Sequence, residues 1–249
     1  MNTEQQINQL REELRKHNYK YYVQDNPTIS DFEFDQKLKQ LQELEDKHPE
    51  FYDANSPTLR VGGQVTKNFE TVAHEYRMYS LSNSYSKEDL EDWETRIKKL
   101  VDGPVEYVCE LKYDGASINL TYENGMLQKA VTRGDGFQGD DVTTNVKTIN
   151  SVPLKLKGDF PPKFEIRGEI VLPFEGFAQM NAERVEAGEE PYRNPRNTAS
   201  GSLKLQDSSE VAKRPLECLL YSIKANRLPF ATQFESLEKA RDWGFKVPD

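Results

Sequence analysis

Cysteine and long apolar runs are scarce in this chain of 249 residues, and each scarcity excludes a class of protein. The two cysteines, Cys109 and Cys218, lie far apart and neither belongs to a CxxC pair, so a zinc site or a disulfide framework is not expected. No apolar run reaches the length of about eighteen residues that a membrane span requires. The first residues lack the basic and apolar regions of a secretion signal, so we expect a cytoplasmic protein.

Positive charge is also in deficit, because 33 Lys and Arg stand against 42 Asp and Glu, giving a formal net charge of −9. This balance argues against a protein that coats nucleic acid through bulk charge. It leaves room for a nucleic-acid enzyme with a local basic groove. The length allows one large domain, or one domain with a small appendage.

Residues 1–70 are predicted to form a small helical subdomain. Apolar residues recur there at helical spacing, with Ile7, Leu10 and Leu14 in a first helix and Phe34, Leu38, Leu41 and Leu44 in a second. The sequence from Ser30 to Glu33 has the pattern of a capping box, which opens the second helix after a break at 25–27. We place the domain boundary near residue 70, with a second domain over 71–249.

The second domain is predicted to be mixed α+β with an antiparallel sheet. Ser86 is expected to cap a helix with a buried stripe of Leu90, Trp93, Ile97 and Leu100. Alternation of apolar and polar residues then predicts strands at 105–111, 116–122, 126–132, 164–172 and 216–223. A polar helix near 174–186 and a final helix, capped by Thr232 and ended by Gly244, complete the expected elements.

A phosphate site is predicted at the end of one hairpin. In the strand 105–111 and its continuation, Glu110 and Lys112 point to the same face. The Asn124-Gly125 turn closes a hairpin, and counting back from it places Arg133 opposite Ala116, at the level of the turn that follows Lys112. A lysine, an arginine, an acid and several glycines then converge, which suits binding of a phosphate ester.

Lys112 is the candidate nucleophile of this site. An amine must lose a proton to attack, and at a pKa of about 10.4 only about one molecule in 2,500 is unprotonated at pH 7. The charge of Arg133 and partial burial on the sheet are expected to lower that pKa. On these residues alone, a solvated lysine at a strand end is the alternative, and Asn-Gly and Gly-Asp-Gly are often plain turns.

Four segments of the body occur in the order and spacing of a known family: 109–115 (CELKYDG), 132–136 (TRGDG), 165–169 (EIRGE) and 194–197 (NPRN). They resemble the adenylation domain of bacterial NAD-dependent DNA ligases. Residues 21–35 resemble the helical subdomain found only in the NAD-using branch. This resemblance covers essentially the whole chain, and it implies an ATP-grasp-like nucleotidyltransferase domain behind a subdomain that recognises NAD or its NMN half.

The resemblance also implies roles for single residues. Lys112 would attack the adenylyl phosphorus of NAD, release NMN and carry AMP as a phosphoramidate, in surroundings that Asp114 would stabilise. The remaining nucleotide contacts would come from Glu110 at the adenine amino group, Arg133 at the ribose or phosphate, Glu169 at the ribose, and Ser80 and Leu81 in the pocket wall. Arg196 and Lys204 would contact the phosphate of AMP or of nucleic acid.

In the helical subdomain, two acids and two tyrosines are expected to bind the cationic nicotinamide ring. Asp31 and Asp35 lie four residues apart, hence on one helix face, and Tyr21 and Tyr22 end the preceding helix. Carboxylates and aromatic faces are suitable partners for a cationic ring. The alternatives are stabilisation of the helix dipole for the acids and ordinary core packing for the tyrosines.

A local concentration of basic residues is predicted to form a groove for a nucleic-acid backbone, and its members are Arg193, Arg196, Lys204, Lys213 and Arg214. Such contacts position a duplex without reading its sequence. The alternative is a solvated cluster of surface charges.

The resemblance finally implies a longer enzyme, because the family continues beyond residue 249 with further motifs and domains. We expect a fragment of a DNA ligase (NAD+), EC 6.5.1.2, which self-adenylates weakly and needs other domains to seal nicks during DNA replication and repair. NAD as the AMP donor, Mg²⁺ and nicked duplex DNA are the expected cofactors and partner, the sequence does not indicate the metal ligands, and a monomer is expected. Two alternatives stay open: a non-catalytic fragment that binds NAD or NMN, and an ATP-dependent polynucleotide ligase or capping relative.

Overall fold

A computed structural model describes residues 2–22, 24, 26, 28–61 and 68–248, without the side chains of Tyr22, Asp31 and Val61. The helices are α1 (Thr3–Tyr22), α2 (Asp31–Lys47), α3 (Lys87–Lys98), α4 (Thr143–Val146), α5 (Phe174–Glu186), α6 (Pro195–Leu203), α7 (Ser208–Ala212) and α8 (Gln233–Trp243), with short 3-10 helices at Pro49–Phe51 and Pro57–Val61. The strands are β1 (Thr71–Ala73), β2 (Ala116–Glu123), β3 (Met126–Thr132), β4 (Gln138–Asp140), β5 (Lys163–Val171) and β6 (Glu217–Lys224).

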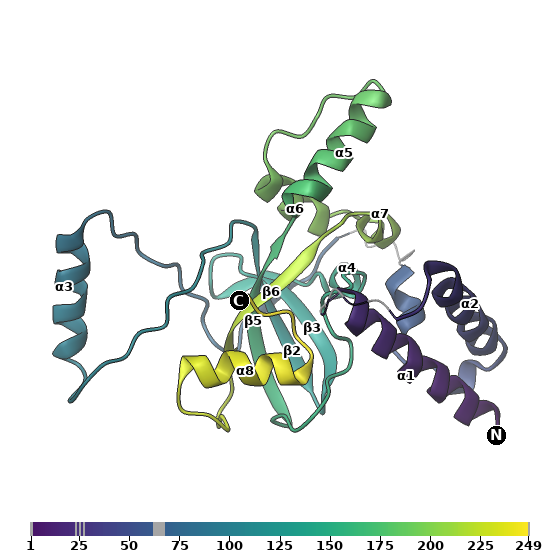
Figure 1. The fold of residues 1–249 in the computed structure, drawn as a ribbon, viewed down its shortest axis with the longest axis horizontal. Helices are drawn as coiled ribbons and strands as arrows, with labels where there is room; N and C mark the ends of the chain where they lie inside the picture. The colour runs from purple at the N-terminus through teal and green to yellow at the C-terminus, as the bar shows by residue number, and fades with distance from the viewer. Residues whose placement is uncertain (1, 23, 25, 27, 62–67, 249) are drawn as a thin grey trace.

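An antiparallel sheet of four strands, in the order β3-β2-β5-β6, forms the centre of the molecule. Figure 1 shows α8 running beside this sheet, α1 and α2 paired at one side, α5 projecting from one end, and α3 standing apart on two extended arms. The predicted α+β class with an antiparallel sheet is therefore confirmed. The short strands β1 and β4, which pair with each other, were not predicted from the sequence.

The helical unit is built as the sequence pattern predicts. Ile7, Leu10, Leu14 and Leu41 are buried between α1 and α2, and Phe34, Leu38 and Leu44 pack against them. The Ser30 capping box is present at the start of α2. A partly buried polar network joins α1, α2 and the segment after them, because the Glu45 carboxylate accepts hydrogen bonds from Arg11 at 2.7 Å, Ser56 at 2.7 Å and Thr58 at 2.6 Å.

The main core lies on one face of the central sheet. Alternate residues of β2 and β5 point into it, among them Ile118, Tyr122 and Phe164, and they meet Trp243 and Phe245 from the C-terminal segment. Trp243 also donates from Nε1 to the carbonyl of Asp159 at 2.7 Å, and so fixes α8 to the body. The opposite face of the same strands is polar, and it is on that face that the cleft described below opens.

The hairpin register differs from the sequence prediction by one residue. Asn124 and Gly125 form the turn with φ values of +50° and +75°, and Tyr122 pairs with Leu127 as expected. A β-bulge between Thr121 and Tyr122 then shifts the register. Arg133 accordingly donates its N–H to the carbonyl of Ser117 at 3.2 Å, so the predicted pairing with Ala116 is wrong.

The predicted strand at 105–111 does not form, and this is a second correction. A strand needs a neighbour for its N–H and C=O groups. In the described chain these residues belong to neither sheet, because they run along the arm that carries α3 (Figure 1). The argument that strand alternation places Glu110 and Lys112 on one face therefore does not apply.

The buried stripe predicted for α3 is a third correction. Ser86 caps the helix with a complete capping box, as predicted, but Leu90 is 54% exposed and Leu100 is 82% exposed. The ring of Trp93 packs against that of Tyr107 in the arm that follows α3, with ring centroids 5.3 Å apart. Helical periodicity identified the apolar face correctly, but no element of the body covers it (Figure 1).

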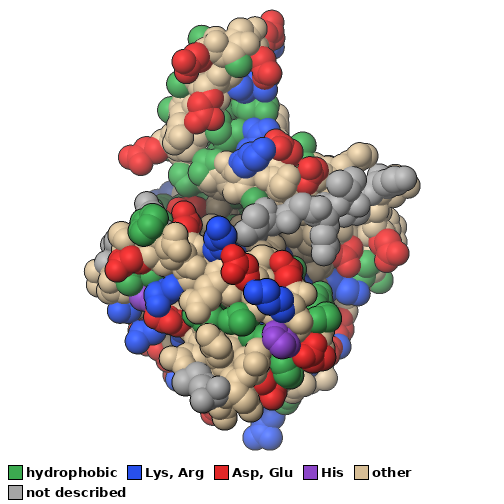
Figure 2. All heavy atoms as spheres, turned by 90° about the vertical axis from the view of Figure 1, so that its right-hand side faces the viewer, with side chains coloured by type: hydrophobic (Ala, Val, Ile, Leu, Met, Phe, Trp, Pro, Cys, Tyr) green, Lys and Arg blue, Asp and Glu red, His purple; other side chains and the backbone are tan. Residues whose placement is uncertain are grey.

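Polar contacts join the helical unit to the body. The Arg60 guanidinium donates to the carbonyls of Ile149 and Val152, each at 2.8 Å, and Lys155 pairs with Glu12 of α1. Figure 2 shows the face of the molecule on which the helical unit lies, with acidic and basic side chains interspersed over it. No helix within the described residues is long and apolar enough to cross a membrane.

Candidate functional site

One cleft of about 750 Å³ opens on the polar face of the sheet. Its walls come from the loop before α3, the segment that returns from α3, the end of β3, strands β5 and β6, and helices α6 and α8. The predicted site residues that line it are Ser80, Leu81, Glu110, Lys112, Arg133, Glu169, Arg196 and Lys204. Segments that are far apart in the sequence, from Met78 to Pro248, thus contribute to one concave surface.

Glu169 of β5 is the half-buried acid of the cleft. Its Oε1 accepts a hydrogen bond from the N–H of Gly115 at 3.2 Å. Burial raises the pKa of the Glu169 carboxyl, although this N–H and the charges of Lys112, Arg196 and Arg133 act in the opposite direction. The structure therefore brings this acid and the three cations close enough to interact electrostatically.

Lys112 lies on the exposed segment just before Gly115. The partial burial expected for Lys112 is absent, because the strand that would have carried it does not form. Gly115 itself is packed tightly, since a Cβ there would lie 2.2 Å from the carbonyl oxygen of Ile170. This glycine lets the turn after Lys112 lie directly against β5.

The loop after β3 shapes the wall opposite Glu169. Arg133 donates from its NH1 group to Ser80 Oγ at 3.4 Å, which connects two predicted nucleotide contacts. Gly136 has a φ of +92°, and its carbonyl accepts from the N–H of Met78 at 2.8 Å. Asp135 accepts from the N–H groups of the two residues 137 and 138, which lowers its pKa and identifies it as a residue of the turn.

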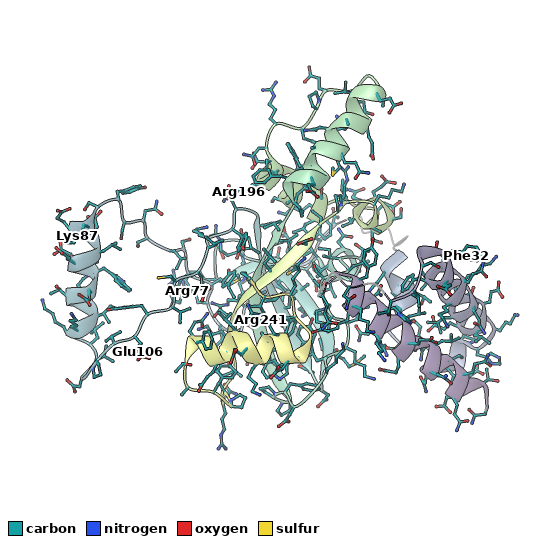
Figure 3. All side chains as sticks on the ribbon, in the orientation of Figure 1. Phe32, Arg77, Lys87, Glu106, Arg196 and Arg241 are labelled. Carbon is teal, nitrogen blue, oxygen red and sulfur yellow. The ribbon has the colours of Figure 1, made fainter. Side chains whose placement is uncertain are left out.

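Helix α6 presents the two predicted phosphate contacts at its two ends. Asn194 caps the helix by accepting from the N–H of Asn197 at 3.0 Å, which fixes its first turn. Arg196 pairs there with Asp114 at 3.2 Å, and Lys204 at the other end pairs with Asp140 at 2.7 Å. Asp114 therefore lies beside Arg196, and Figure 3 shows Arg196 where α6 meets the body.

The five basic residues expected to form one groove lie in more than one place. Arg193 and Arg214 line a second cleft of about 370 Å³ beside α6, where Arg214 donates to the hydroxyl of Tyr192 at 3.0 Å. Lys213 pairs with Glu210 of α7 at 2.6 Å. Among the five, only Arg196 and Lys204 line the cleft that contains Lys112.

The acids and tyrosines of the helical unit are not brought to this cleft. Tyr21 is 44% exposed and Asp35 is exposed, and no described residue of α1 or α2 lines the cleft. The side chains of Tyr22 and Asp31 lie outside the described part of the structure. Figure 3 shows Phe32, next to Asp31 in sequence, on the opposite side of the molecule from α3.

Sequence reasoning missed several residues that line the cleft. Strand alternation does place Arg167 on the face of Glu169 but assigns it no role; in the structure it lines the cleft and donates to the carbonyls of Tyr76 at 2.6 Å and Arg77 at 3.0 Å. Tyr221 of β6 and Gln233 of α8 also line the cleft, and they carry no motif that would have identified them.

A metal site made by protein side chains alone is not present in the described residues, since they contain no group of three or more His, Cys, Asp or Glu that could hold an ion. The cleft does offer single carboxylates, Glu110, Glu169 and Asp140, near its cationic residues. Mg²⁺ commonly uses one or two carboxylates together with substrate phosphates and water. The donor set therefore fits an ion that arrives with a phosphate ligand.

Comparison with known proteins gives consistent matches along the chain. Residues 66–249 match the profile of the NAD-dependent DNA ligase adenylation domain, and residues 1–62 match the DNA ligase-like N-terminal NAD+-binding domain. A protein named DNA ligase from Christiangramia forsetii is 76% identical over 248 residues, and one from Flavobacterium psychrophilum is 72% identical over 245 residues. These matches cover 100% and 98% of this chain, but the chain spans only 37% of the length of either relative.

Proposed function

This chain belongs to the NAD-dependent DNA ligase family, and on that premise we propose that it carries out the enzyme-adenylation step of a DNA ligase (NAD+), EC 6.5.1.2, with NAD as the AMP donor. The observation that carries the proposal is the single cleft in which Lys112 lies with Arg133, Arg196 and Lys204. A nucleophilic amine beside three cationic groups is suited to attack on a phosphoryl centre. The match of residues 1–62 to an NAD+-binding domain favours this function over that of an ATP-dependent relative.

Lys112 is the nucleophile in this proposal. After its ammonium loses a proton to solvent, the Nζ lone pair forms a bond to the adenylyl phosphorus of NAD, and the nitrogen releases a second proton to solvent to give the phosphoramidate. The bond from that phosphorus to the bridging oxygen breaks, and NMN leaves with the electron pair. Arg133, Arg196 and Lys204 stabilise the negative charge on the phosphoryl oxygens, and the cleft holds the two reactants in line.

The other residues of the cleft orient the nucleotide. Glu110 accepts from the adenine amino group, Glu169 binds the ribose, and Ser80 and Leu81 form part of the wall. Asp114 keeps Arg196 near Lys112 through the ion pair at 3.2 Å. Mg²⁺ would be held by the phosphates of NAD with a carboxylate of the cleft, and when bound it would neutralise phosphate charge.

The helical unit, residues 1–70, recognises the NMN half of NAD through Tyr21, Tyr22, Asp31 and Asp35, and residues 71–249 form an ATP-grasp-like nucleotidyltransferase domain. Because the described residues of α1 and α2 do not line the cleft, recognition of one NAD molecule by both units requires the helical unit to change its position. The hydrogen bond from Arg60 and the ion pair of Lys155 then hold the helical unit in its present position and break when it moves to the cleft.

In the complete enzyme, the AMP on Lys112 is transferred to the 5′-phosphate at a nick in duplex DNA during replication and repair. Arg196 and Lys204 contact the phosphate groups of that substrate. The enzyme acts as a monomer in the cytoplasm, where its DNA substrate lies. Sealing requires parts of the enzyme in addition to this chain, which spans 37% of its relatives.

Mass spectrometry after incubation with NAD and Mg²⁺ tests the adenylation step. The expected result is the covalent gain of one AMP by the chain and no gain by the Lys112→Ala variant. Adduct formation from ATP and not from NAD would instead favour the ATP-dependent alternative. Tight binding of NAD without any adduct would favour the alternative of a non-catalytic binding fragment.

A further inference from the structure

Gln233, the first residue of α8, is the starting point of an inference that rests on the proposed function and extends it. Its side-chain nitrogen Nε2 donates to Glu110 Oε1 at 2.8 Å and to the backbone carbonyl of Tyr221 at 2.7 Å. All three residues line the cleft that contains Lys112. Gln233 thus connects strand β6 to the carboxylate that the proposed function assigns to the adenine base.

The chemistry of the partners fixes the orientation of the Gln233 amide. A backbone carbonyl and a carboxylate only accept hydrogen bonds, so the NH₂ group and not the amide oxygen must face both Tyr221 and Glu110. One hydrogen of that NH₂ group is available for each partner. The contact therefore holds Glu110 as an acceptor and occupies one of its two oxygens.

The position of Gln233 is itself well determined. Thr232 caps α8 by accepting from the N–H of Glu235 at 3.2 Å, and the Glu235 carboxylate accepts from the N–H of Thr232 at 3.1 Å. This capping box fixes the first helical turn, in which Gln233 lies. Burial of Ala240 and Trp243 further along the same helix anchors α8 on the core.

Glu110, by contrast, has little support from its own segment. Residues 105–111 form no strand and Glu110 is exposed, so no backbone ladder fixes the position of its carboxylate. The contact with Gln233 spans 123 residues of sequence and connects this segment to the sheet. Holding a free carboxylate in one orientation lowers the cost of ordering it when a ligand binds.

We propose that Gln233 is a positioning residue for base selection: by holding the Glu110 carboxylate against β6, it makes the cleft accept a purine with an exocyclic amino donor and reject one with a carbonyl oxygen at the same position. Adenine presents the amino group, whereas hypoxanthine presents an oxygen that would face the carboxylate acceptor. A site built to accept from a donor discriminates strongly against a ligand that lacks it, because its polar group is then left unpaired.

The test compares the binding of AMP and IMP by calorimetry in the Lys112→Ala background, where no adduct can form. The parent variant is expected to bind AMP more tightly than IMP by about a hundredfold. Gln233→Ala should reduce that ratio by about tenfold, chiefly through weaker AMP binding. Gln233→Glu, which places a second carboxylate against Glu110 and the Tyr221 carbonyl, should reduce it at least as much.

Gln179→Ala is the matched control, because Gln179 of α5 also donates from Nε2 to a carboxylate, Glu183 Oε1 at 3.0 Å, away from the cleft. It should leave the ratio of AMP to IMP affinity unchanged. If Gln233 only supported the fold, Gln233→Ala would weaken the binding of AMP and of IMP equally. An unchanged ratio of the two affinities would therefore overturn the inference. The AMP and IMP titrations involve no bond formation. A failure to form the AMP adduct from NAD would therefore refute the proposed chemistry, and the titrations would still decide whether Gln233 controls base selection.

Discussion

The N–H of Gly115 donates to Glu169 Oε1 at 3.2 Å, and this bond fixes the turn that follows Lys112 to the central strand β5. Gly115 can approach β5 so closely because it has no Cβ, and the Glu169 carboxyl that accepts its N–H is half-buried. One backbone contact thereby places the turn after Lys112, the proposed nucleophile, against the acid of the cleft. Substitutions at Glu169 are therefore expected to change both the stability of the protein and its binding of nucleotide.

Glu169→Gln is expected to stabilise the ligand-free protein at neutral pH while weakening nucleotide binding. Burial raises the pKa of Glu169 in the folded state above its value in the unfolded chain, so the folded state holds the proton more tightly. This contribution to stability is complete below the unfolded pKa and is lost as the pH rises through the folded pKa. We expect the variant to melt about 1–3 °C above the wild type at pH 8.

At pH values below the unfolded pKa of Glu169 both proteins carry a neutral side chain at this position, so the difference in melting temperature should shrink. Thermal unfolding at a series of pH values between 4 and 8, read by calorimetry, measures it. A variant that is less stable than the wild type by the same amount at every pH would contradict the assignment of burial as the dominant effect.

Gly136→Ala is expected to lower stability and also to displace residues 78–81, the proposed nucleotide-binding wall of the cleft. Gly136 has a φ of +92°, and a Cβ there would lie 2.4 Å from the carbonyl oxygen of Met78, just before Ser80. Gly188 has a φ of +74° but no atom within 4 Å of an added Cβ, so Gly188→Ala serves as a control for backbone strain alone. Gly188→Ala should lose about 2–4 °C in melting temperature, and Gly136→Ala should lose more because the Met78 carbonyl must also move.

Only Gly136→Ala should also weaken AMP binding, by about tenfold, because the wall from Met78 to Leu81 must move. Calorimetric titration of both variants with AMP separates the two effects. Equal AMP affinities in the two variants would show that this wall does not contact the nucleotide.

Local features of this fold were predictable from the sequence because neighbouring residues decide them. The capping boxes of Ser30, Ser86 and Thr232 each depend on residues three apart, and all three are present. The Asn124-Gly125 turn depends on the positive φ that both residues tolerate. Predictions of such features do not depend on how the rest of the chain folds.

Features that depend on distant partners were not predictable in the same way. The bulge between Thr121 and Tyr122 leaves no signature in the alternation of apolar residues, yet it moves Arg133 by one position. The stripe of α3 shows that one face is apolar, but periodicity does not identify what covers it. Tyr221 and Gln233 enter the cleft through the pairing of β6 with β5 and the position of α8 beside the sheet, which no local motif specifies.

Lys155→Glu is expected to strengthen NAD binding if the helical unit must leave its present position. Lys155 of the body pairs with Glu12 of α1, and the substitution turns this attraction into repulsion. Because exposed ion pairs contribute about 0.2–1 kcal/mol, the gain in NAD affinity should be about two- to fivefold. Lys239→Glu, which makes the same charge change on α8 beside Asp242, is the control. Equal or weaker NAD binding by Lys155→Glu, measured by calorimetry, would argue that this contact belongs to the binding-competent arrangement.

The double variant Arg196→Ala and Lys204→Ala is expected to weaken binding of nicked duplex DNA in a full-length ligase that contains this chain. Both side chains line the cleft and pair there with the carboxylates of Asp114 and Asp140, which a phosphate group can replace. Each lost phosphate contact should reduce the slope of log K against log salt by about 0.9, so the slope should fall by nearly two. Lys239→Ala should leave it unchanged, and an unchanged slope in the double variant would exclude both residues from the DNA-binding surface.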